Sequence, residues 1–413
     1  MSETRGRETF LRQFRMLPKS AKTILIGTFC ARFASFMIWP FFAVLMARRF
    51  GTSIAELGVI FSISAFAAIL TSPISGVVAD KLNRRVIMLL STLAIMGLYC
   101  VLALWSSEPL YFAVIIVMSV ANGALEPLLR SALGDCAAKE EDRPLLFHLR
   151  YYLVNIAGAL GPLCGVWFAS NNSNLAFLAG AIAYAILAAC VLASVTRTIV
   201  ATNREEEVPI PRLLKVALTD RLFMTLFVSN FFLVILYAQM DEPLTFFLLF
   251  LETANINGII ASINVTNTSV VLIVHLFLMK WLITLEEHKA VLVAFFFLML
   301  GLLVVAFNKA EIMELWLVAI ALATLAEIIA MPLFATVVDR MAPVRLRNSY
   351  MGLYMLSNAG AAAVPFIAAL VIERFGGGPL FLTSAMLCIP VAYMSFRLLS
   401  ATEIKEKVAE EVA

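Results

Sequence analysis

Long apolar stretches alternate with short polar connections along the whole chain. A helix needs roughly 20 apolar residues to cross a bilayer, and helices or closed barrels are the structures that satisfy every backbone hydrogen bond there. Twelve stretches come close to this length, at about 23–46, 54–78, 86–105, 110–129, 145–170, 175–195, 222–251, 256–281, 290–307, 315–338, 350–372 and 379–399. The pattern predicts an all-α integral membrane protein with twelve transmembrane helices.

One long polar segment, 196–220, divides these stretches into six and six. It contains Arg204, three consecutive glutamates and two prolines. We therefore expect five parts along the chain: a cytoplasmic tail at 1–22, an N-terminal six-helix bundle at 23–195, a cytoplasmic linker at 196–220, a C-terminal six-helix bundle at 221–400 and a cytoplasmic C-terminal tail at 401–413.

The distribution of cations predicts the orientation. With both termini in the cytoplasm, 26 of the 31 lysines and arginines lie on the cytoplasmic side, four lie on the opposite side and Arg32 lies inside the first helix. Cytoplasmic loops carry such an excess of Lys and Arg. We expect a multi-pass protein of the cell inner (plasma) membrane with both termini cytoplasmic.

Composition narrows the classes of function. Hydrophobic residues make up 62% of the chain and charged residues 14%, whereas soluble domains are roughly 45–50% apolar. The six cysteines and three histidines have no ligand-like spacing, and no phosphate-binding G-x-x-x-x-G-K-[ST] sequence occurs. We expect no metal, no cofactor, no nucleic-acid partner and no enzymatic activity. The expected partners are the lipid bilayer, protons and a small-molecule substrate, with the chain acting as a monomer.

Residues 76–85, with the sequence G-V-V-A-D-K-L-N-R-R, form a charged hinge between the second and third predicted helices. They resemble the loop signature of the major facilitator superfamily, G-x-x-x-D-[RK]-x-G-R-[RK]. Asn83 stands where the second glycine is expected, and asparagine tolerates the left-handed backbone conformation of such a turn. The resemblance implies two pseudo-symmetric six-helix bundles, with a substrate site between them near mid-membrane.

The same resemblance implies a gate formed by Gly76, Asp80, Arg84 and Asp135. Asp80 would interact with the start of the eleventh helix, near 348–350, where the helix dipole favours a carboxylate. Arg84 would pair with Asp135, the acid that ends the fourth helix. A solvated pair of this kind is worth only about 0–1 kcal/mol, so the gate matters only if it is partly desolvated in one state.

The fifth predicted helix contains Gly158, Gly161, Pro162 and Gly165. This pattern resembles the antiporter motif g-x-x-x-G-P-x-x-G-G of superfamily members that exchange their substrate for protons, with Val166 in place of the last glycine. The spacing of small residues by itself predicts close helix packing, and a proline weakens the helix around it.

A faint internal repeat links the two halves. Asn155 precedes Pro162 by seven residues in the fifth helix, and Asn358 precedes Pro365 by seven residues in the eleventh. Parallel repeats are typical of the major facilitator architecture. The alternative is that glycine and proline are simply frequent in membrane helices.

Ionisable residues inside the predicted helices are candidates for proton coupling, because each is costly in a bilayer unless it is paired or faces water. Arg32 lies near the midplane and keeps its charge, so it needs an acid nearby. Glu126 is the nearest candidate in the same half. Glu327 is the candidate in the other half, in a Glu…Pro pattern that resembles the tenth helix of drug exporters.

We expect Glu126 to exchange the proton, with Arg32 setting its affinity. Arg32 would then supply the cation that many proton-coupled members carry in the middle of the fourth helix, which this chain lacks. The alternative is a static ion pair that holds the first and fourth helices in register.

The seventh predicted helix carries Tyr237, Gln239 and Asp241 just before a proline. This cluster resembles the broken part of the seventh helix in drug exporters, and Asp241 is a further candidate for proton coupling. The alternative is that Asp241 and its neighbouring glutamate lie in headgroup water. The candidate substrate-binding residues are Tyr237, Gln239, Asn155 and Asn264, although the two asparagines could equally bond between helices.

The resemblance places the chain nearest to the twelve-helix drug:proton antiporter branch of the superfamily. We therefore expect multidrug-type efflux of small hydrophobic or amphipathic organic molecules by proton antiport and alternating access. The 31 phenylalanines and 18 methionines favour a pliable apolar cavity. The alternatives are a proton-coupled exporter or importer of a specific metabolite, such as a sugar, peptide or siderophore, and a membrane receptor without transport activity.

Overall fold

The computed structural model describes residues 17–81, 83–137, 143–171, 173–195, 219–277, 285–308, 312–342 and 347–412. Every regular element in these ranges is helical. Twelve helical spans among the described residues are long and apolar enough to cross a membrane, and each coincides with one of the twelve stretches expected from the sequence. The prediction of an all-α membrane protein is therefore confirmed.

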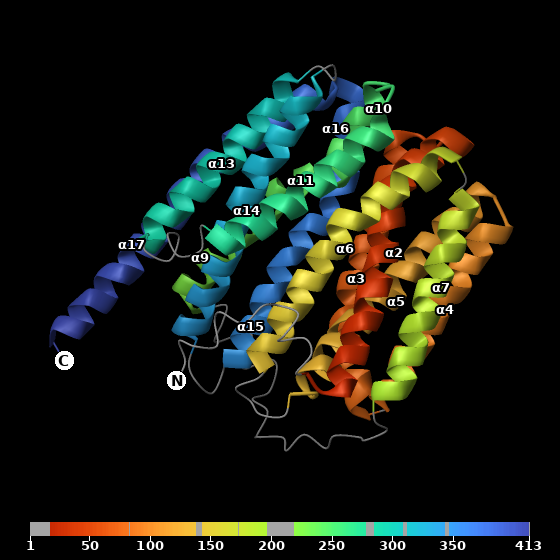
Figure 1. The fold of residues 1–413 in the computed structure, drawn as a ribbon. Helices are drawn as coiled ribbons and strands as arrows, with labels where there is room; N and C mark the ends of the chain where they lie inside the picture. The colour runs from red at the N-terminus through yellow and green to blue at the C-terminus, as the bar shows by residue number, and fades with distance from the viewer. Residues whose placement is uncertain are drawn as a thin grey trace. The chain divides into compact units, whose positions relative to one another are not determined.

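The chain forms two compact units, one of residues 1–50 and 63–202 and the other of residues 51–62 and 203–413. The helices of the first unit are α2 (Lys19–Phe50), most of α3 (Ile54–Lys81), α4 (Arg84–Leu104), α5 (Glu108–Gly134), α6 (Arg143–Asn171) and α7 (Ser173–Ser194). Within it α2 packs against both α6 and α7, and α4 packs against α5 and α7 (Figure 1).

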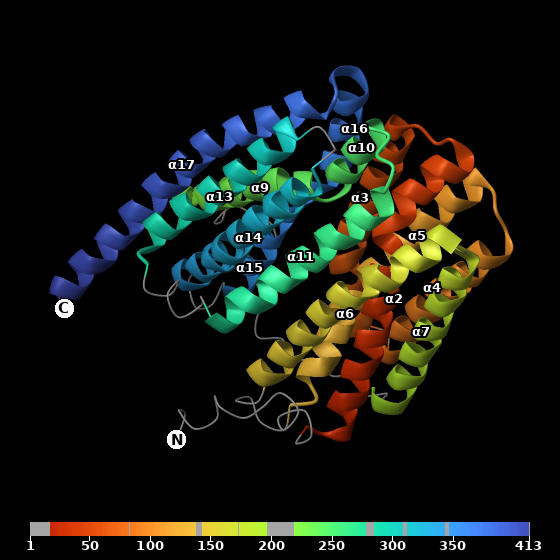
Figure 2. The same ribbon diagram turned by 45° about the horizontal axis from the view of Figure 1, so that its top comes forward.

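The second unit contains α9 (Arg221–Tyr237), η3 (Ala238–Met240), α10 (Glu242–Phe250), α11 (Ile256–Phe277), α13 (Glu287–Phe307), α14 (Met313–Met341), α15 (Arg347–Met355), η5 (Leu356–Ala363), α16 (Val364–Phe375) and α17 (Gly377–Val412). Here α13 packs against α14 and α17, and Figure 2 shows α13 and α17 side by side. The expected tail at 401–413 continues α17 as helix up to Val412.

The first residues of α3 belong to the second unit, which the sequence did not predict. A Cβ atom on Gly58 would lie 2.4 Å from Cβ of Ala369 and 2.7 Å from the carbonyl oxygen of Pro365, both on α16. The hydroxyl of Ser62 accepts a hydrogen bond of 2.9 Å from the backbone N–H of Phe366. The glycine thus permits the close approach of the two backbones.

Two spans of the second unit are interrupted. The seventh is α9, the short η3 and α10, and the break falls at Tyr237–Glu242, as the resemblance predicted. The eleventh is α15, the 3₁₀ segment η5 and α16, which has a proline as its second residue. Proline has no N–H to continue the ladder, so Pro365 leaves the preceding turn without that bond.

The expected hinge at 76–85 is mostly helical. The structure continues α3 to Lys81 and starts α4 at Arg84. Asn83 is extended, with φ −66° and ψ 113°, and its side chain accepts a hydrogen bond from the N–H of Arg85. The expectation of a left-handed asparagine is therefore wrong. Asn83 is instead the N-cap of α4, a position that this side chain favours.

Candidate functional site

The first unit holds a cluster of three arginines around one acid, which we call the arginine cluster: Arg32 of α2, Glu126 and Arg130 of α5, and Arg150 of α6. Arg32 and Arg150 each donate a charge-assisted hydrogen bond to Glu126. Nε of Arg130 donates a third, of 3.0 Å, from one helical turn away. The pairing of Arg32 with Glu126 was expected, whereas the parts of Arg130 and Arg150 were not.

The arginine cluster is half-buried and unequally charged. The side chains of Arg150 and Glu126 are 12% and 22% exposed, while those of Arg32 and Arg130 are 33% and 60% exposed. Among the described residues, Glu126 is the only acid that forms an ion pair with these arginines. Three guanidinium groups therefore face one carboxylate.

Arg150 could have been found from helix lengths alone. Glu126 lies eight residues before the end of α5, and Arg150 lies seven residues after the start of α6. Consecutive helices joined by a short loop run in opposite directions, and each residue advances about 1.5 Å. The two side chains are thus at nearly the same depth on neighbouring helices.

A chain of neutral polar groups lies in the same unit. The hydroxyl of Tyr184 in α7 donates a hydrogen bond of 3.2 Å to Oδ1 of Asn122 in α5, and it lies 3.2 Å from the hydroxyl of Ser35 in α2. Asn122 and Ser35 are close in sequence to Glu126 and Arg32. These bonds join α7 to α2 and α5, the helices that carry Arg32, Glu126 and Arg130, and polar bonds between membrane helices favour association.

The second unit holds a different arrangement, which we call the glutamate cluster: Tyr237 of α9, Asn267 of α11, and Thr324 and Glu327 of α14. The hydroxyl of Tyr237 donates a hydrogen bond of 2.5 Å to Oε2 of Glu327. The amide of Asn267 donates to the hydroxyls of Thr324 at 2.8 Å and Tyr237 at 3.4 Å. In the described part of the chain no cationic side chain forms an ion pair with Glu327, and its hydrogen-bond partners Tyr237 and Asn267 are neutral.

Gln239 and Asp241, in the break after α9, differ in burial. Gln239 is buried, 6% exposed, and its Oε1 atom has no hydrogen-bond partner among the described residues. Asp241 is exposed and precedes α10, but its carboxylate makes no capping bond to that helix. The structure therefore does not bring Asp241 into the hydrogen bonds of the glutamate cluster.

The remaining substrate-binding candidates bond within their own helices. The amide of Asn155 donates to the carbonyl of Tyr151 at 2.9 Å, and that of Asn264 donates to the carbonyl of Ile260 at 2.9 Å. Both side chains are only partly buried. Their role in substrate binding stays a prediction.

Only some residues of the expected gate lie in the described part of the chain. Nη1 of Arg84 lies 2.5 Å from Oδ2 of Asp135 and donates to the hydroxyl of Ser131 at 3.1 Å. The pairing of Arg84 with Asp135 is thus present. The side chains of Asp80 and of residues 348–349 lie outside the described part, and a Cβ atom on Gly76 would meet nothing within 4 Å.

The glycines of the antiporter motif bring α6 against α2. A Cβ atom on Gly161 would lie 2.8 Å from Cβ of Phe36, and one on Gly165 would lie 2.3 Å from the carbonyl oxygen of Met37. Gly158 and Pro162 are buried in the same helix, which continues without a break through the proline. The predicted close packing is therefore present at Gly161 and Gly165.

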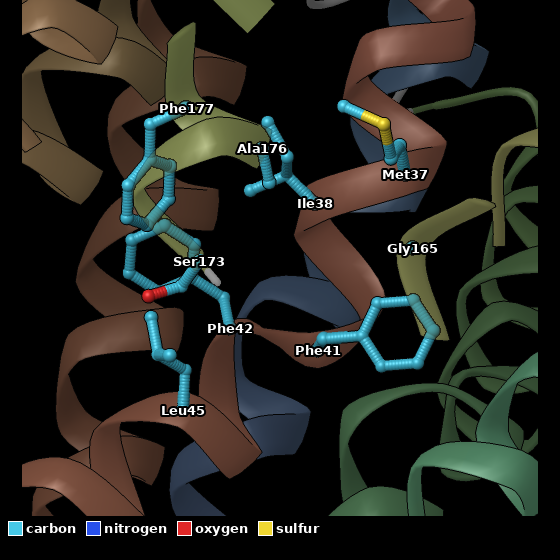
Figure 3. Close-up of a pocket in the computed structure, with 9 residues that line it drawn as sticks. All are labelled: Met37, Ile38, Phe41, Phe42, Leu45, Gly165, Ser173, Ala176 and Phe177. Atoms are coloured by element: carbon cyan, nitrogen blue, oxygen red, sulfur yellow. The ribbon is translucent and has the colours of Figure 1, made fainter. Parts of the chain in front are cut away.

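An apolar pocket lies beside this contact (Figure 3). Its lining comes from α2, α6 and α7 and consists of Met37, Ile38, Phe41, Phe42, Leu45, Gly165, Ser173, Ala176 and Phe177. Ser173 supplies the one hydroxyl, and no lining residue is charged. The pocket is thus apolar, unlike the arginine cluster and the glutamate cluster.

The described residues contain no group of three His, Cys, Asp or Glu side chains that could hold a metal ion.

The twelve spans among the described residues, with charged groups within them, define the class, a multi-pass helical membrane protein. The sequence matches the family model described as Major Facilitator Superfamily over residues 24–364, which is most of the chain. The chain therefore belongs to the major facilitator superfamily, and it is a secondary transporter rather than an enzyme.

Named relatives agree with this assignment. The chain is 21% identical to the uncharacterized MFS-type transporter YdeE of Escherichia coli (strain K12) over 376 residues, 90% of this chain and 94% of that protein. It is 32% identical to the uncharacterized MFS-type transporter YqjV of Bacillus subtilis (strain 168) over 164 residues, which span 40% of each.

The fold also matches solved structures. A crystal structure of a POT family transporter in complex with a thioalcohol-conjugated peptide superposes with a TM-score of 0.77 at 14% identity, covering 92% of this chain and 98% of that chain. At this identity the match shows the fold alone. It confirms the expected major facilitator fold, while substrate and coupling belong to the following proposal.

Proposed function

We propose that this transporter exports small amphipathic organic molecules across the plasma membrane in exchange for protons, and that Glu327 is the group that exchanges the proton. Glu327 lies at the middle of α14, which runs from Met313 to Met341. An acid inside a membrane span is costly and is by default a functional candidate. The resemblance of the helix-five sequence to the antiporter motif supports antiport, and its Gly161 and Gly165 lie in close contact with α2.

The contrast between the two acids carries the proposal. Glu126 has three guanidinium partners, which suits a permanent counter-ion. Glu327 has neutral partners, Tyr237 among them, so nothing in the described part of the second unit opposes its protonation by direct ion pairing. This reverses the order in which the sequence ranked the two acids, and it favours the static ion-pair alternative for Arg32 and Glu126.

Uptake by proton symport is the second candidate, and one observation favours it. A proton on Glu126 would release the guanidinium donors of Arg32 and Arg150 for a substrate anion. Proton and substrate would then bind together and move in the same direction.

The sign of a pH change separates the two candidates. Purified protein is reconstituted in liposomes with equal pH on both sides and a pH-sensitive dye inside, and ethidium, chloramphenicol or naphthalenesulfonate is added outside. Antiport predicts that the lumen becomes alkaline as protons leave in exchange for the compound. Symport predicts that the lumen becomes acidic.

Variants of α14 test the residue assignment in the same assay. Glu327→Gln is expected to abolish the pH change while keeping exchange of labelled for unlabelled compound, which needs no net proton movement. Glu314→Gln, an exposed acid in the first turn of the same helix, is the matched control and should behave like the unmodified protein. An unchanged pH response in Glu327→Gln would refute the assignment.

A further inference from the structure

We propose that the arginine cluster binds an anionic group of the transported molecule, so that the substrate is an amphipathic organic anion with a carboxylate, sulfonate or phosphate. This assignment rests on the proposed function only in taking the bound anion to be the transported substrate. It is supported by the charge of the cluster, its hydrogen-bond donors and the surface beside it.

The charges of the arginine cluster do not cancel. Among the described residues, Arg32, Arg130 and Arg150 share Glu126 as their one ion-pair partner. Buried charges in membrane helices are normally paired. Two positive charges are left over. A bound carboxylate or sulfonate compensates one of them, and a phosphate dianion compensates both.

The guanidinium groups also have more N–H donors than their hydrogen bonds to Glu126 use. In the described part of the chain, their hydrogen bonds run to Glu126 alone, with Arg130 and Arg150 on Oε1 and Arg32 on Oε2. Nε of Arg150 is buried and has no partner among the described residues. A guanidinium group presents several N–H donors in one plane that match two oxygens of a carboxylate, sulfonate or phosphate.

The cluster is reachable and has an apolar surface beside it. Arg130 and Arg32 are 60% and 33% exposed, so an anion can approach without unfolding the helices. Phe29 and Phe36 lie three residues before and four residues after Arg32 on α2, on the same helix face. Both rings are partly exposed. They offer an apolar surface to the organic part of the ligand.

The test compares two ligands of nearly equal shape that differ in charge, naphthalenesulfonate and naphthalenesulfonamide. Their dissociation constants are measured by calorimetry on the full-length protein in neutral detergent, without any pH gradient. We expect the sulfonate to bind at least about tenfold more tightly than the sulfonamide, because charge-assisted bonds are the stronger ones. Equal affinities would overturn the proposal.

If the proposal holds, Arg150→Gln and Glu126→Gln change the affinity for the sulfonate in opposite directions. Arg150→Gln should weaken sulfonate binding about tenfold, whereas Glu126→Gln should strengthen it, because the competing carboxylate is removed. If Arg150→Gln does not fold, Arg130→Gln, at the most exposed position, is used with the same expectation. Arg49→Gln is the matched control on α2, since that guanidinium donates to the hydroxyl of Tyr111 instead. Equal weakening by Arg150→Gln and Glu126→Gln would indicate a purely structural ion pair and overturn the proposal.

A lipid headgroup carries the same chemistry, so nanodiscs distinguish the two sources. The sulfonate titration is repeated in phosphatidylcholine and in phosphatidylcholine mixed with phosphatidylglycerol. We expect the same affinity in both. A tenfold loss with phosphatidylglycerol would assign the cluster to lipid and refute the substrate assignment.

The binding and flux experiments distinguish a failure of the anion site from a failure of the proposed function. Anion-selective binding without any proton-linked pH change would sink the proposed function and leave the anion site standing. Proton-linked transport of ethidium and chloramphenicol without anion selectivity would sink the anion site alone.

Discussion

The hydroxyl of Tyr237 and the carboxyl group of Glu327 are joined by a hydrogen bond of 2.5 Å that links α9 to α14. Tyr237 lies at the last residue of α9, immediately before the break in the seventh span. A proton that enters or leaves Glu327 therefore changes a bond at the point where this span is interrupted. Protonation and the local geometry of the break are thus physically connected.

Removing that hydroxyl should impair coupling. A hydrogen bond to a charged group is worth about 1.5–3 kcal/mol, so we expect Tyr237→Phe to reduce proton-driven transport roughly tenfold or more. Binding of the same compound without a gradient should change little. Tyr393→Phe, on an exposed face of α17, is the control. Proton-driven transport by Tyr237→Phe at the unmodified rate would contradict the role given to this bond.

Alanine substitutions at two glycines should change the stability of the protein in opposite directions, because one glycine lies in the close contact of the antiporter motif and the other lies in open space. Gly165→Ala would place a methyl group 2.3 Å from a backbone oxygen of α2, and such overpacking costs about 1–3 kcal/mol. Gly97→Ala in α4 meets nothing within 4 Å and should stabilise that helix by about 0.5–1 kcal/mol. Thermal unfolding in detergent should show a lower midpoint for the first variant and an equal or higher one for the second. A tolerated Gly165→Ala would show that α2 and α6 are not in tight contact.

The pair of Arg84 and Asp135 should be weak. Nη1 and Oδ2 lie 2.5 Å apart, but Asp135 is 43% exposed, and exposed pairs contribute about 0–1 kcal/mol. A double-mutant cycle with Arg84→Gln and Asp135→Asn should give a coupling energy in that range, shrinking further in high salt. A coupling energy above about 3 kcal/mol that does not change with salt concentration would mean that the pair is desolvated in the dominant state.

A buried polar network should stabilise the interrupted eleventh span. Asn230 in α9 donates to Ser357 at 2.6 Å and accepts from the hydroxyl of Tyr354 at 2.9 Å. Asn230→Leu leaves both hydroxyls buried without this partner, at a cost of about 1–3 kcal/mol each. We expect a lower unfolding midpoint, partly restored by adding Tyr354→Phe. Equal stability of Asn230→Leu and the unmodified protein would show that the network contributes nothing.

The sequence predicts the spans well, because a bilayer imposes one length and one polarity on every crossing helix. The break at Tyr237–Glu242 was predicted by the resemblance to drug exporters, because the apolar run itself continues over 222–251. The 3₁₀ segment η5 was missed. Pro365 removes one backbone donor at its end. Gly360 also lies so close to α9 that a Cβ atom there would come within about 3 Å of Phe231 and Ile235, and no local pattern reveals that neighbour.

The candidate site was half predicted. The cost of a lone charge in the bilayer leads from Arg32 to Glu126, and the structure contains that pair. Arg150 was missed because it was counted among the loop cations, although the lengths of α5 and α6 place it beside Glu126. The bonds of Tyr237, Asn267 and Thr324 around Glu327 join three helices distant in sequence, so helical spacing within one segment cannot show them.

Infrared difference spectroscopy tests the assignment of Glu327 most directly. The carbonyl stretch of a protonated carboxylic acid is followed in the purified protein while the pH is stepped through the physiological range. We predict one titrating band that Glu327→Gln removes and Glu126→Gln leaves in place. A band that survives in Glu327→Gln and disappears in Glu126→Gln would return the exchanged proton to the arginine cluster and contradict the account.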